Sequence, residues 1–298
     1  MISSLCVFHL QKRCFFDTAN IQKGTDMSFL QDLDVFSTKS EEISLANKTA
    51  LVTGASAGIG LATCAWLAKE GVNLIMVARR HARLEAIKQE LLAKFPNVTI
   101  SIYAADITEK ADIEKLKQKN AFHVDIFINN AGLALGRSPV ADLIETDIDD
   151  MINTNVTAAF KLASYVAKYM ADKRSGHIVN LGSISSYYTY DGGSVYCATK
   201  FAVRAFTCAL RQEMFDKNVR VSLVSPGIVK TDFSLVRYKG DIKKANQVYD
   251  GIECLQPSDI ARVILKTLKE PEHVTLDEVL VMPTVQAPVS SKIYKKQP

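Results

Sequence analysis

A tyrosine and a lysine at helical spacing are the first candidates for acid–base chemistry in this chain. Tyr196 and Lys200 are four residues apart in a segment that predicts a helix, so both side chains lie on one face. A tyrosine with an ordinary pKa of ~10 is a poor base at neutral pH, and a nearby ammonium group favours its phenolate form. Because many helices carry such a pair, it predicts little without further residues.

Two polar residues elsewhere in the chain complete a candidate set. Ser183 ends the apolar stretch 176–183, which predicts a strand. In open α/β sheets, ligands bind outside the carboxyl ends of the strands, so this serine has a suitable place. Asn155 lies within the expected helix Ile148–Met170. With the tyrosine and the lysine, these residues form a candidate catalytic quartet.

A glycine-rich turn follows the first expected strand and precedes a helix. Its sequence, T-G-A-S-A-G-I-G at 53–60, has glycines where a chain must turn sharply and approach a pyrophosphate closely. The helix that follows offers free N–H groups and the positive end of its dipole. The turn therefore predicts a dinucleotide site formed by Gly54, Ser56, Gly58, Ile59 and Gly60.

The same turn also spells G-x-S-x-G, the nucleophile elbow of α/β-hydrolases, with Ser56 as the nucleophile. That elbow needs an earlier strand whose loop supplies an oxyanion-hole N–H, whereas this turn follows the very first strand. The one late histidine, His273, follows Pro271 and Glu272 in a polar turn. The hydrolase interpretation is therefore disfavoured.

The end of the second expected strand indicates which dinucleotide is bound. An acid at this place would accept a hydrogen bond from a ribose 2′-hydroxyl and select NAD. This chain has Arg79 and Arg80 instead, 19 residues beyond Gly60. Guanidinium groups suit a 2′-phosphate through charge-assisted bonds, so we expect NADP(H) as the cofactor.

Short apolar segments alternate with longer amphipathic ones from Lys48 onward, as in βαβ units around a parallel sheet. The apolar segments are continuous, which indicates that both faces of the sheet are covered. The sequence therefore predicts one doubly wound α/β domain over 47–288, a Rossmann fold with a seven-stranded parallel sheet and helices on both faces. The expected strands are 49–54, 73–78, 98–106, 124–132, 176–183, 219–227 and 278–283, and the expected helices are 60–71, 82–95, 148–170, 196–215 and 257–268.

Composition excludes several classes of protein. The 298 residues are 48% hydrophobic and 23% charged, which suits a large core and excludes a disordered chain. The net charge of +4 is small and scattered, so we expect no nucleic-acid partner. The uncharged run Ala50–Ala68 contains the glycine turn, and we therefore expect no integral membrane segment.

The two ends of the chain lack the alternating pattern. Residues 1–46 predict an N-terminal extension, and 289–298 a polar tail. The first sixteen residues hold two bases and no acid, which fits either mitochondrial targeting by residues 1–26 or a disordered extension. Six cysteines at wide, irregular spacings favour reduced thiols in the cytoplasm over a disulfide framework or a metal site.

In order and spacing, these motifs resemble the short-chain dehydrogenase/reductase family over about Lys48–Pro288. The shared features are the glycine turn, N-N-A-G at 129–132, Y-C-A-T-K at 196–200, Ser225-Pro226-Gly227, Asn155 and Ser183. The resemblance implies that the tyrosine is the general acid/base and that the lysine tunes it and holds the nicotinamide ribose. It implies that the serine orients the substrate oxygen and that the asparagine supports a water-linked proton path.

The resemblance also implies further cofactor contacts. Asp106 would meet the adenine and Asn129 the adenine ribose region, with Ala131 beside them. The stretch Pro226–Thr231, including Ile228, would hold the nicotinamide side. Ala57 departs from the NADP-preferring members that carry a base at this position, which weakens the NADP expectation.

Several longer stretches are similar to the subgroup of NADP-dependent 3-hydroxy acid dehydrogenases, also called serine 3-dehydrogenases or L-allo-threonine dehydrogenases. These stretches include N-N-A-G-L-A-L-G-R-S-P-V and V-R-Y-K-G-D at 236–241. The similarity implies reversible oxidation of the C3 hydroxyl of small acids such as serine, L-allo-threonine, 3-hydroxyisobutyrate or 3-hydroxypropionate. The alternatives are a general carbonyl or 3-oxoacyl reductase of the same family and a catalytically silent NADP-binding sensor.

A carboxylate substrate in a closed, apolar pocket needs a cation beside it. The segment after Thr231 is expected to be irregular and to fold over the nicotinamide as a lid. Arg237 is the first candidate for the substrate carboxylate, Lys239 the second and Arg137 the third, although such bases are often only a solvated loop face.

Two helices predict self-association. Residues 158–170 and 202–215 carry apolar residues over more than one face, which indicates a second partner for each helix. Family members commonly assemble through these helices, so we expect a homotetramer. Among the cysteines, Cys197 next to the catalytic tyrosine is the one for which thiol sensitivity is worth testing.

Overall fold

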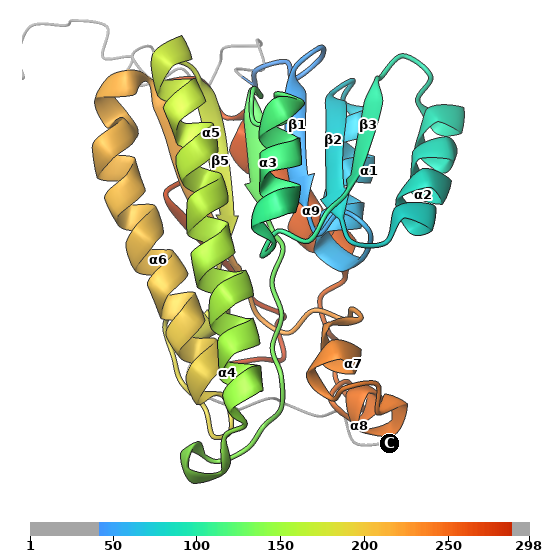
Figure 1. The fold of residues 1–298 in the computed structure, drawn as a ribbon, viewed down its shortest axis with the longest axis vertical. Helices are drawn as coiled ribbons and strands as arrows, with labels where there is room; N and C mark the ends of the chain where they lie inside the picture. The colour runs from blue at the N-terminus through green and yellow to red at the C-terminus, as the bar shows by residue number, and fades with distance from the viewer. Residues whose placement is uncertain (1–41, 288–298) are drawn as a thin grey trace, which may run out of the picture. The chain divides into compact units, whose positions relative to one another are not determined.

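The computed structural model describes residues 42–287, which form a seven-stranded, all-parallel sheet flanked by helices (Figure 1). The strand order is β3-β2-β1-β4-β5-β6-β7, so the order reverses between β1 and β4. The doubly wound Rossmann-type fold is thereby confirmed. The strands are β1 (Thr49–Thr53), β2 (Asn73–Ala78), β3 (Ile100–Ala104), β4 (Ile126–Asn129), β5 (Gly176–Leu181), β6 (Val219–Pro226) and β7 (Glu278–Val281).

Helices cover both faces of the sheet (Figure 1). On one face, α1, α2 and α9 pack through residues such as Leu67, Leu84 and Ile264, and on the other α3, α5 and α6 pack through residues such as Leu162 and Leu210. The main helices are α1 (Gly58–Lys69), α2 (His81–Lys94), α3 (Lys110–Gln118), α4 (Glu145–Ile152), α5 (Ala159–Lys173), α6 (Ser194–Met214), α7 (Phe233–Arg237), α8 (Ile242–Gln247) and α9 (Pro257–Lys269).

Local sequence explains where several helices begin and end. Proline opens α9 at its first position, and the side chains of Gln256 and Asp259 cap its free N–H groups reciprocally. Gly71 follows α1 with a φ of +77°, a conformation that glycine adopts without strain. Short helices of one turn, Val140–Asp142, Ile184–Ser186 and Phe215–Lys217, link the larger elements.

The structure corrects the expected elements in three places. The helix expected over 148–170 is interrupted by a π-helical turn, Asn153–Ala158, between α4 and α5. The segment after Thr231, expected to be irregular, contains the short helices α7 and α8. The helix α3 was absent from the expected elements because its nine residues include only two buried apolar ones.

The packed domain begins before residue 47, the expected boundary. The side chain of Leu45 is buried in the core beside α1, and the Ile43 N–H donates a hydrogen bond to the carbonyl oxygen of Lys269. Residues 42–46 therefore belong to the domain. The expected extension up to residue 41 and the tail 289–298 lie outside the described residues.

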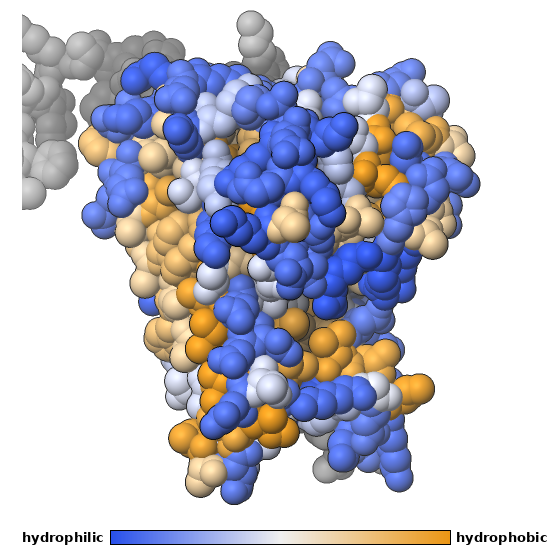
Figure 2. Space-filling model, viewed as in Figure 1, coloured by the Kyte–Doolittle hydropathy of each residue, from blue (hydrophilic) through white to orange (hydrophobic). Residues whose placement is uncertain are grey.

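In the described part of the chain, every helix is too short or too polar to cross a membrane. Apolar side chains do remain on the surface, and Figure 2 shows them near α4 and α7. Val140, Ile144 and Val236 are among these residues.

Alanine substitutions of Phe127 on β4 and Phe215 after α6 measure how much burial in the core contributes to the free energy of unfolding. Phe127 is fully buried, whereas Phe215 is 77% exposed. We expect Phe127→Ala to lower the free energy of unfolding by about 3–5 kcal/mol, since it leaves a cavity. Phe215→Ala should change it by less than about 0.5 kcal/mol. Urea denaturation of both variants measures the difference, and equal effects would contradict the described packing.

Candidate active site

A cleft of about 1190 Å³ lies at the carboxyl ends of the strands, where the strand order reverses between β1 and β4. Ligands bind at this place in doubly wound folds. Most residues predicted for cofactor, substrate and catalysis line it. They are Gly54, Ser56, Gly58, Ile59, Arg79, Arg80, Asp106, Ala131, Ser183, Tyr196, Lys200, Pro226, Ile228, Thr231 and Arg237.

The ends of β1 and β4 are joined by hydrogen bonds on the floor of the cleft. The hydroxyl of Thr53 accepts from the N–H groups of Asn130 and Ala131, each at 3.0 Å. The side-chain amide of Asn130 donates back to the Thr53 carbonyl oxygen at 2.8 Å. These bonds hold the two strand ends at the separation that shapes the cleft.

The glycine turn leaves a helix N-terminus open to the cleft. Gly54 has a φ of +66° and Gly58 one of +51°. A Cβ atom on Gly60 would collide with the carbonyl oxygen of Gly54, so Gly60 lets α1 pack closely against the turn although it does not itself line the cleft. Ala57, at the N-cap of α1, provides no side-chain cap, and the first turn carries no acid. Its N–H groups and dipole therefore suit an anion such as a phosphate.

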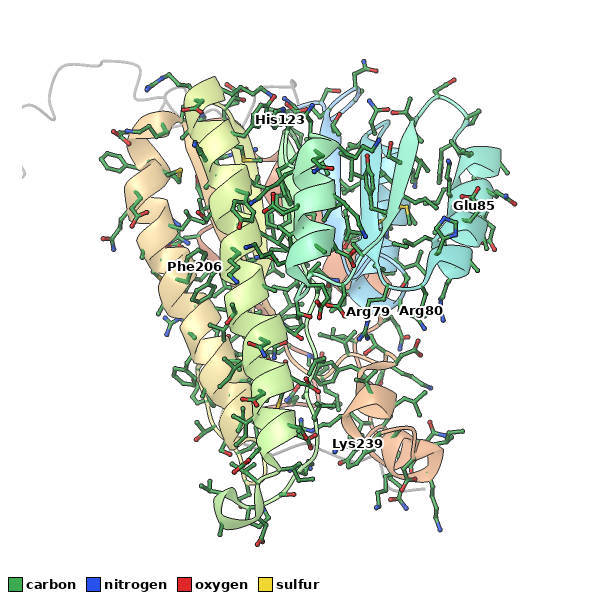
Figure 3. All side chains as sticks on the ribbon, viewed as in Figure 1. Arg79, Arg80, Glu85, His123, Phe206 and Lys239 are labelled. Carbon is green, nitrogen blue, oxygen red and sulfur yellow. The ribbon has the colours of Figure 1, made fainter. Side chains whose placement is uncertain are left out.

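Two arginines lie at the carboxyl end of β2, at the mouth of the cleft (Figure 3). The Arg80 guanidinium donates to the Ser56 hydroxyl at 3.1 Å, which links it to the glycine turn. Arg79 is 3.9 Å from the Asp106 carboxylate and its side chain is 70% exposed. No acid occupies the end of β2, so this corner of the cleft carries positive charge.

Ser183, Tyr196 and Lys200 come together from two elements. Ser183 follows β5, where its hydroxyl accepts from the Ser185 N–H at 3.1 Å and caps a short helix. Tyr196 and Lys200 lie one turn apart on α6, and the Ser183 side chain lies near enough to the tyrosine hydroxyl to lower its pKa slightly. The lysine ammonium donates to the carbonyl oxygen of Leu181, the last residue of β5, at 2.7 Å.

Burial is the largest influence on the pKa values of Tyr196 and Lys200. It raises the pKa of Tyr196 above its usual range, against smaller lowering effects of the Ser183 side chain and the Arg237 charge. It also lowers the pKa of Lys200 to about 8, so that this lysine stays mostly protonated at neutral pH. The expected lowering of the tyrosine pKa by the lysine is therefore not what the structure has. Burial of the phenol outweighs the neighbouring charge.

Asn155 lies in the π-helical turn between α4 and α5, and π-turns occur frequently at functional sites. Its side chain bonds both backbone groups of Leu133, accepting at 2.8 Å and donating at 2.7 Å, and donates to the Thr199 hydroxyl at 3.1 Å. It does not line the cleft. In this structure, therefore, Asn155 holds the loop after β4 against α6.

Asn129 is placed differently from the expectation. Its side chain is buried behind the cleft, where it donates to the Ala159 carbonyl oxygen and to Asn180. The next residue, Asn130, lines the cleft instead. Asn129 is the last residue of β4 and its side chain points toward α5, whereas Asn130 follows the strand and lies at the carboxyl edge of the sheet, where the cleft is.

Lys239 is also directed elsewhere. Its ammonium pairs with the Asp147 carboxylate at 2.8 Å, and the residue does not line the cleft (Figure 3). Cys197, beside the tyrosine, is buried, and burial raises the pKa of its thiol, which disfavours the reactive thiolate.

Gln286 and Tyr190 are among the cleft residues that the sequence did not predict. Gln286 accepts from the Ile228 N–H at 2.8 Å and so fastens the end of the described chain to the loop after β6. Tyr190 accepts a hydrogen bond from Arg237 at 2.6 Å. Tyr190 lies in a stretch that contains three tyrosines between 187 and 190, but neither it nor Gln286 belongs to a recognisable motif.

A family model described as short chain dehydrogenase matches residues 48–240, which is most of the described domain. The chain belongs to the short-chain dehydrogenase family. This assignment agrees with the glycine turn, the strand order and the tyrosine–lysine pair on α6.

Similar proteins narrow the comparison. An NADP-dependent 3-hydroxy acid dehydrogenase of Schizosaccharomyces pombe is 43% identical over 85% of this chain and 98% of that protein. A serine 3-dehydrogenase of Agrobacterium fabrum is 35% identical over 83% of this chain and 98% of its own length. A solved structure of serine dehydrogenase in its closed form with NADP⁺ is 35% identical, with a TM-score of 0.75 over 80% of this chain and 96% of that one.

The depressed pKa of Lys200 predicts a pH-dependent stability. The folded protein loses this proton at about pH 8, while an unfolded lysine keeps it to about 10.5. Between these values the unfolded chain binds more protons, so this group makes the free energy of unfolding rise with pH. Lys200→Met should lack this contribution. Urea titrations of the cofactor-free protein across the window measure it, with exposed Lys94→Met as control, and parallel curves for wild type and Lys200→Met would contradict it.

Proposed function

We propose that this chain is an NADP(H)-dependent dehydrogenase that reversibly oxidises the C3 hydroxyl of small 3-hydroxy acids. The substrate class includes serine, L-allo-threonine, 3-hydroxyisobutyrate and 3-hydroxypropionate. The observation that carries the proposal is the meeting of Ser183, Tyr196 and Lys200 in one cleft that has Arg79 and Arg80 at its mouth. The names of the similar proteins support both the cofactor and the substrate class.

The cleft fits a phosphorylated dinucleotide. The uncapped N-terminus of α1 and the glycines before it would hold the pyrophosphate, and Arg79 and Arg80 would hold a 2′-phosphate. Asp106 and Ala131 would line the adenine half, and the loop Pro226–Thr231 the nicotinamide half. When bound, the nicotinamide supplies the ring carbon that takes or returns the hydride.

The protein's own residues manage the proton and the orientation of the substrate. In oxidation, the substrate C–O oxygen would lie against Ser183 and Tyr196, and Tyr196 in its phenolate form would take the hydroxyl proton. In reduction, the Tyr196 hydroxyl returns that proton. The Lys200 charge lies 5.9 Å from the Tyr196 ring and would favour the phenolate, although burial of the phenol has the larger effect on its pKa. Asn155 acts as a positioning residue by holding the adjoining loop to α6.

The same fold and quartet would also suit a general carbonyl or 3-oxoacyl reductase. The side chains of Tyr190 and Arg237 favour a dehydrogenase of small acids over such a reductase. These side chains narrow the cleft beside Tyr196 and place a cation there. We further propose a cytoplasmic homotetramer. Support for assembly comes from partly exposed Ile152 and Phe201, at 41% and 40%, on α4 and α6.

Tyr196→Phe tests whether the chain is an enzyme or a silent cofactor-binding sensor. Removing the hydroxyl should lower kcat for 3-hydroxy acid oxidation by about 10³-fold, because no other group there transfers the proton. NADPH affinity should change little. Initial rates with NADP⁺ and fluorescence titration with NADPH measure the two quantities. Turnover that survives the substitution would exclude Tyr196 as the acid/base.

Replacing Arg79 and Arg80 together by alanine tests cofactor choice. Loss of both guanidinium groups should weaken NADPH binding by about 50-fold and leave NADH binding nearly unchanged, since only NADPH carries the 2′-phosphate. Lys94→Ala, which removes one exposed cation at the far end of α2, is the control. Calorimetric titration of each variant with both cofactors gives the comparison, and a parallel loss of NADH affinity would refute the assignment.

A further inference from the structure

The helix α7 brings one cation close to the reacting tyrosine. Its last residue, Arg237, lies with its guanidinium carbon 5.9 Å from the Tyr196 ring centre. Its first residue, Phe233, meets the same ring edge-on at 5.5 Å. The helix therefore covers the phenol with an apolar ring at one end and a charge at the other.

Three neutral oxygens hold the Arg237 side chain in place. Its Nε donates to the Gly136 carbonyl oxygen at 2.9 Å, its Nη1 to the Tyr190 hydroxyl at 2.6 Å and its Nη2 to the Gly192 carbonyl oxygen at 3.1 Å. A guanidinium group has five N–H donors, so one on each terminal nitrogen remains. Within residues 42–287, none of the ion pairs includes Arg237, and its charge is left for another anion.

The other two candidate cations are bound differently. Lys239 is neutralised by Asp147 and lies outside the cleft lining. Arg137 also lines the cleft, but it is an exposed residue whose guanidinium donates to the Asp191 carbonyl oxygen at 3.0 Å and lies 5.5 Å from the Tyr190 ring. Of the three, only Arg237 also contacts the Tyr196 ring.

We propose that Arg237 binds the carboxylate of the substrate through its two remaining N–H groups, and that Tyr190 is the residue that positions it. This proposal rests on the proposed function, since it assigns the group that recognises the acid. Paired N–H groups of arginine match the two oxygens of a carboxylate, and the bond is stronger in a half-buried cleft than in water. The site therefore selects hydroxy acids over neutral alcohols of the same size.

Tyr190 is itself locked in place. Its ring centre lies 5.4 Å from the guanidinium carbon of Arg237 and 5.5 Å from that of Arg137. A Cβ atom on Gly193 would collide with this ring, so glycine makes room for it. The tyrosine hydroxyl accepts from Arg237 and keeps its own proton for donation. Tyr190 thus fixes the direction of the arginine without touching the reacting atoms.

A matched pair of substrates tests the assignment. We compare 3-hydroxyisobutyrate with its methyl ester, which keeps the hydroxyl and nearly the same shape but lacks the charge. Arg237→Ala should raise KM for the acid by about 30-fold. It should change KM for the ester by less than about 2-fold. Equal losses on both substrates would overturn the proposal.

Two further variants keep the test decisive. Tyr190→Phe should reduce the preference for acid over ester by about 5-fold, because the arginine loses one acceptor while the ring remains. If Arg237→Ala shows a lowered melting temperature or weakened NADPH binding, the result for Tyr190→Phe decides the test instead. Arg262→Ala, the loss of an exposed arginine on α9 outside the cleft lining, should keep the preference within about 2-fold. A selective loss in that variant, or none in Tyr190→Phe, would contradict the assignment.

The wild-type protein separates this proposal from the proposed function. Oxidation of the ester with NADP⁺, but not of the acid, would reject 3-hydroxy acids as substrates before any variant is compared. Oxidation of the acid by the wild type, with Arg237→Ala equally impaired on acid and ester, would reject the carboxylate assignment alone.

Discussion

Positive charge without a protein carboxylate beside it organises this cleft. Lys200 is buried, and its ammonium donates to a carbonyl oxygen rather than to an acid, which is why burial lowers its pKa to about 8. Arg237 is bonded to three neutral oxygens. Burying cations in this way costs free energy unless an anion arrives. The arrangement is therefore suited to anionic ligands and to a phenolate that forms during the reaction.

The sheet holds the groups that contact these charges in fixed positions. Carbonyl oxygens at the end of β5 and bonds between the ends of β1 and β4 are held by the parallel ladders behind them, whose residues are almost fully buried. Helix α6 is 21 residues long and fastens Tyr196 and Lys200 to that edge through its packing on β6 and α5. Because the strands end together, small polar bonds at their ends place groups from distant parts of the sequence within one cleft.

Much of the fold and the catalytic residues could be predicted because their signals are local. Seven continuous apolar segments, a glycine turn and the spacing of Tyr196 and Lys200 each depend on neighbouring residues alone. The side chain of Asn129 could not be placed in this way, since its direction depends on the register of β4 against β5. The raised pKa of Tyr196 could not be predicted either, because Phe233, which helps to bury the phenol, lies on a helix that begins 37 residues further along the chain.

Helix α7 shows how few residues can combine two tasks. Phe233 covers the reacting phenol and keeps water from it, while Arg237, one turn later, ties the same helix to the loops after β4 and β5. An anion bound by Arg237 would contact the same side chain that holds α7 over the tyrosine. Substrate charge and closure of the cleft are then coupled through one side chain, so a neutral ligand of the same shape would gain the apolar contact without strengthening the cover.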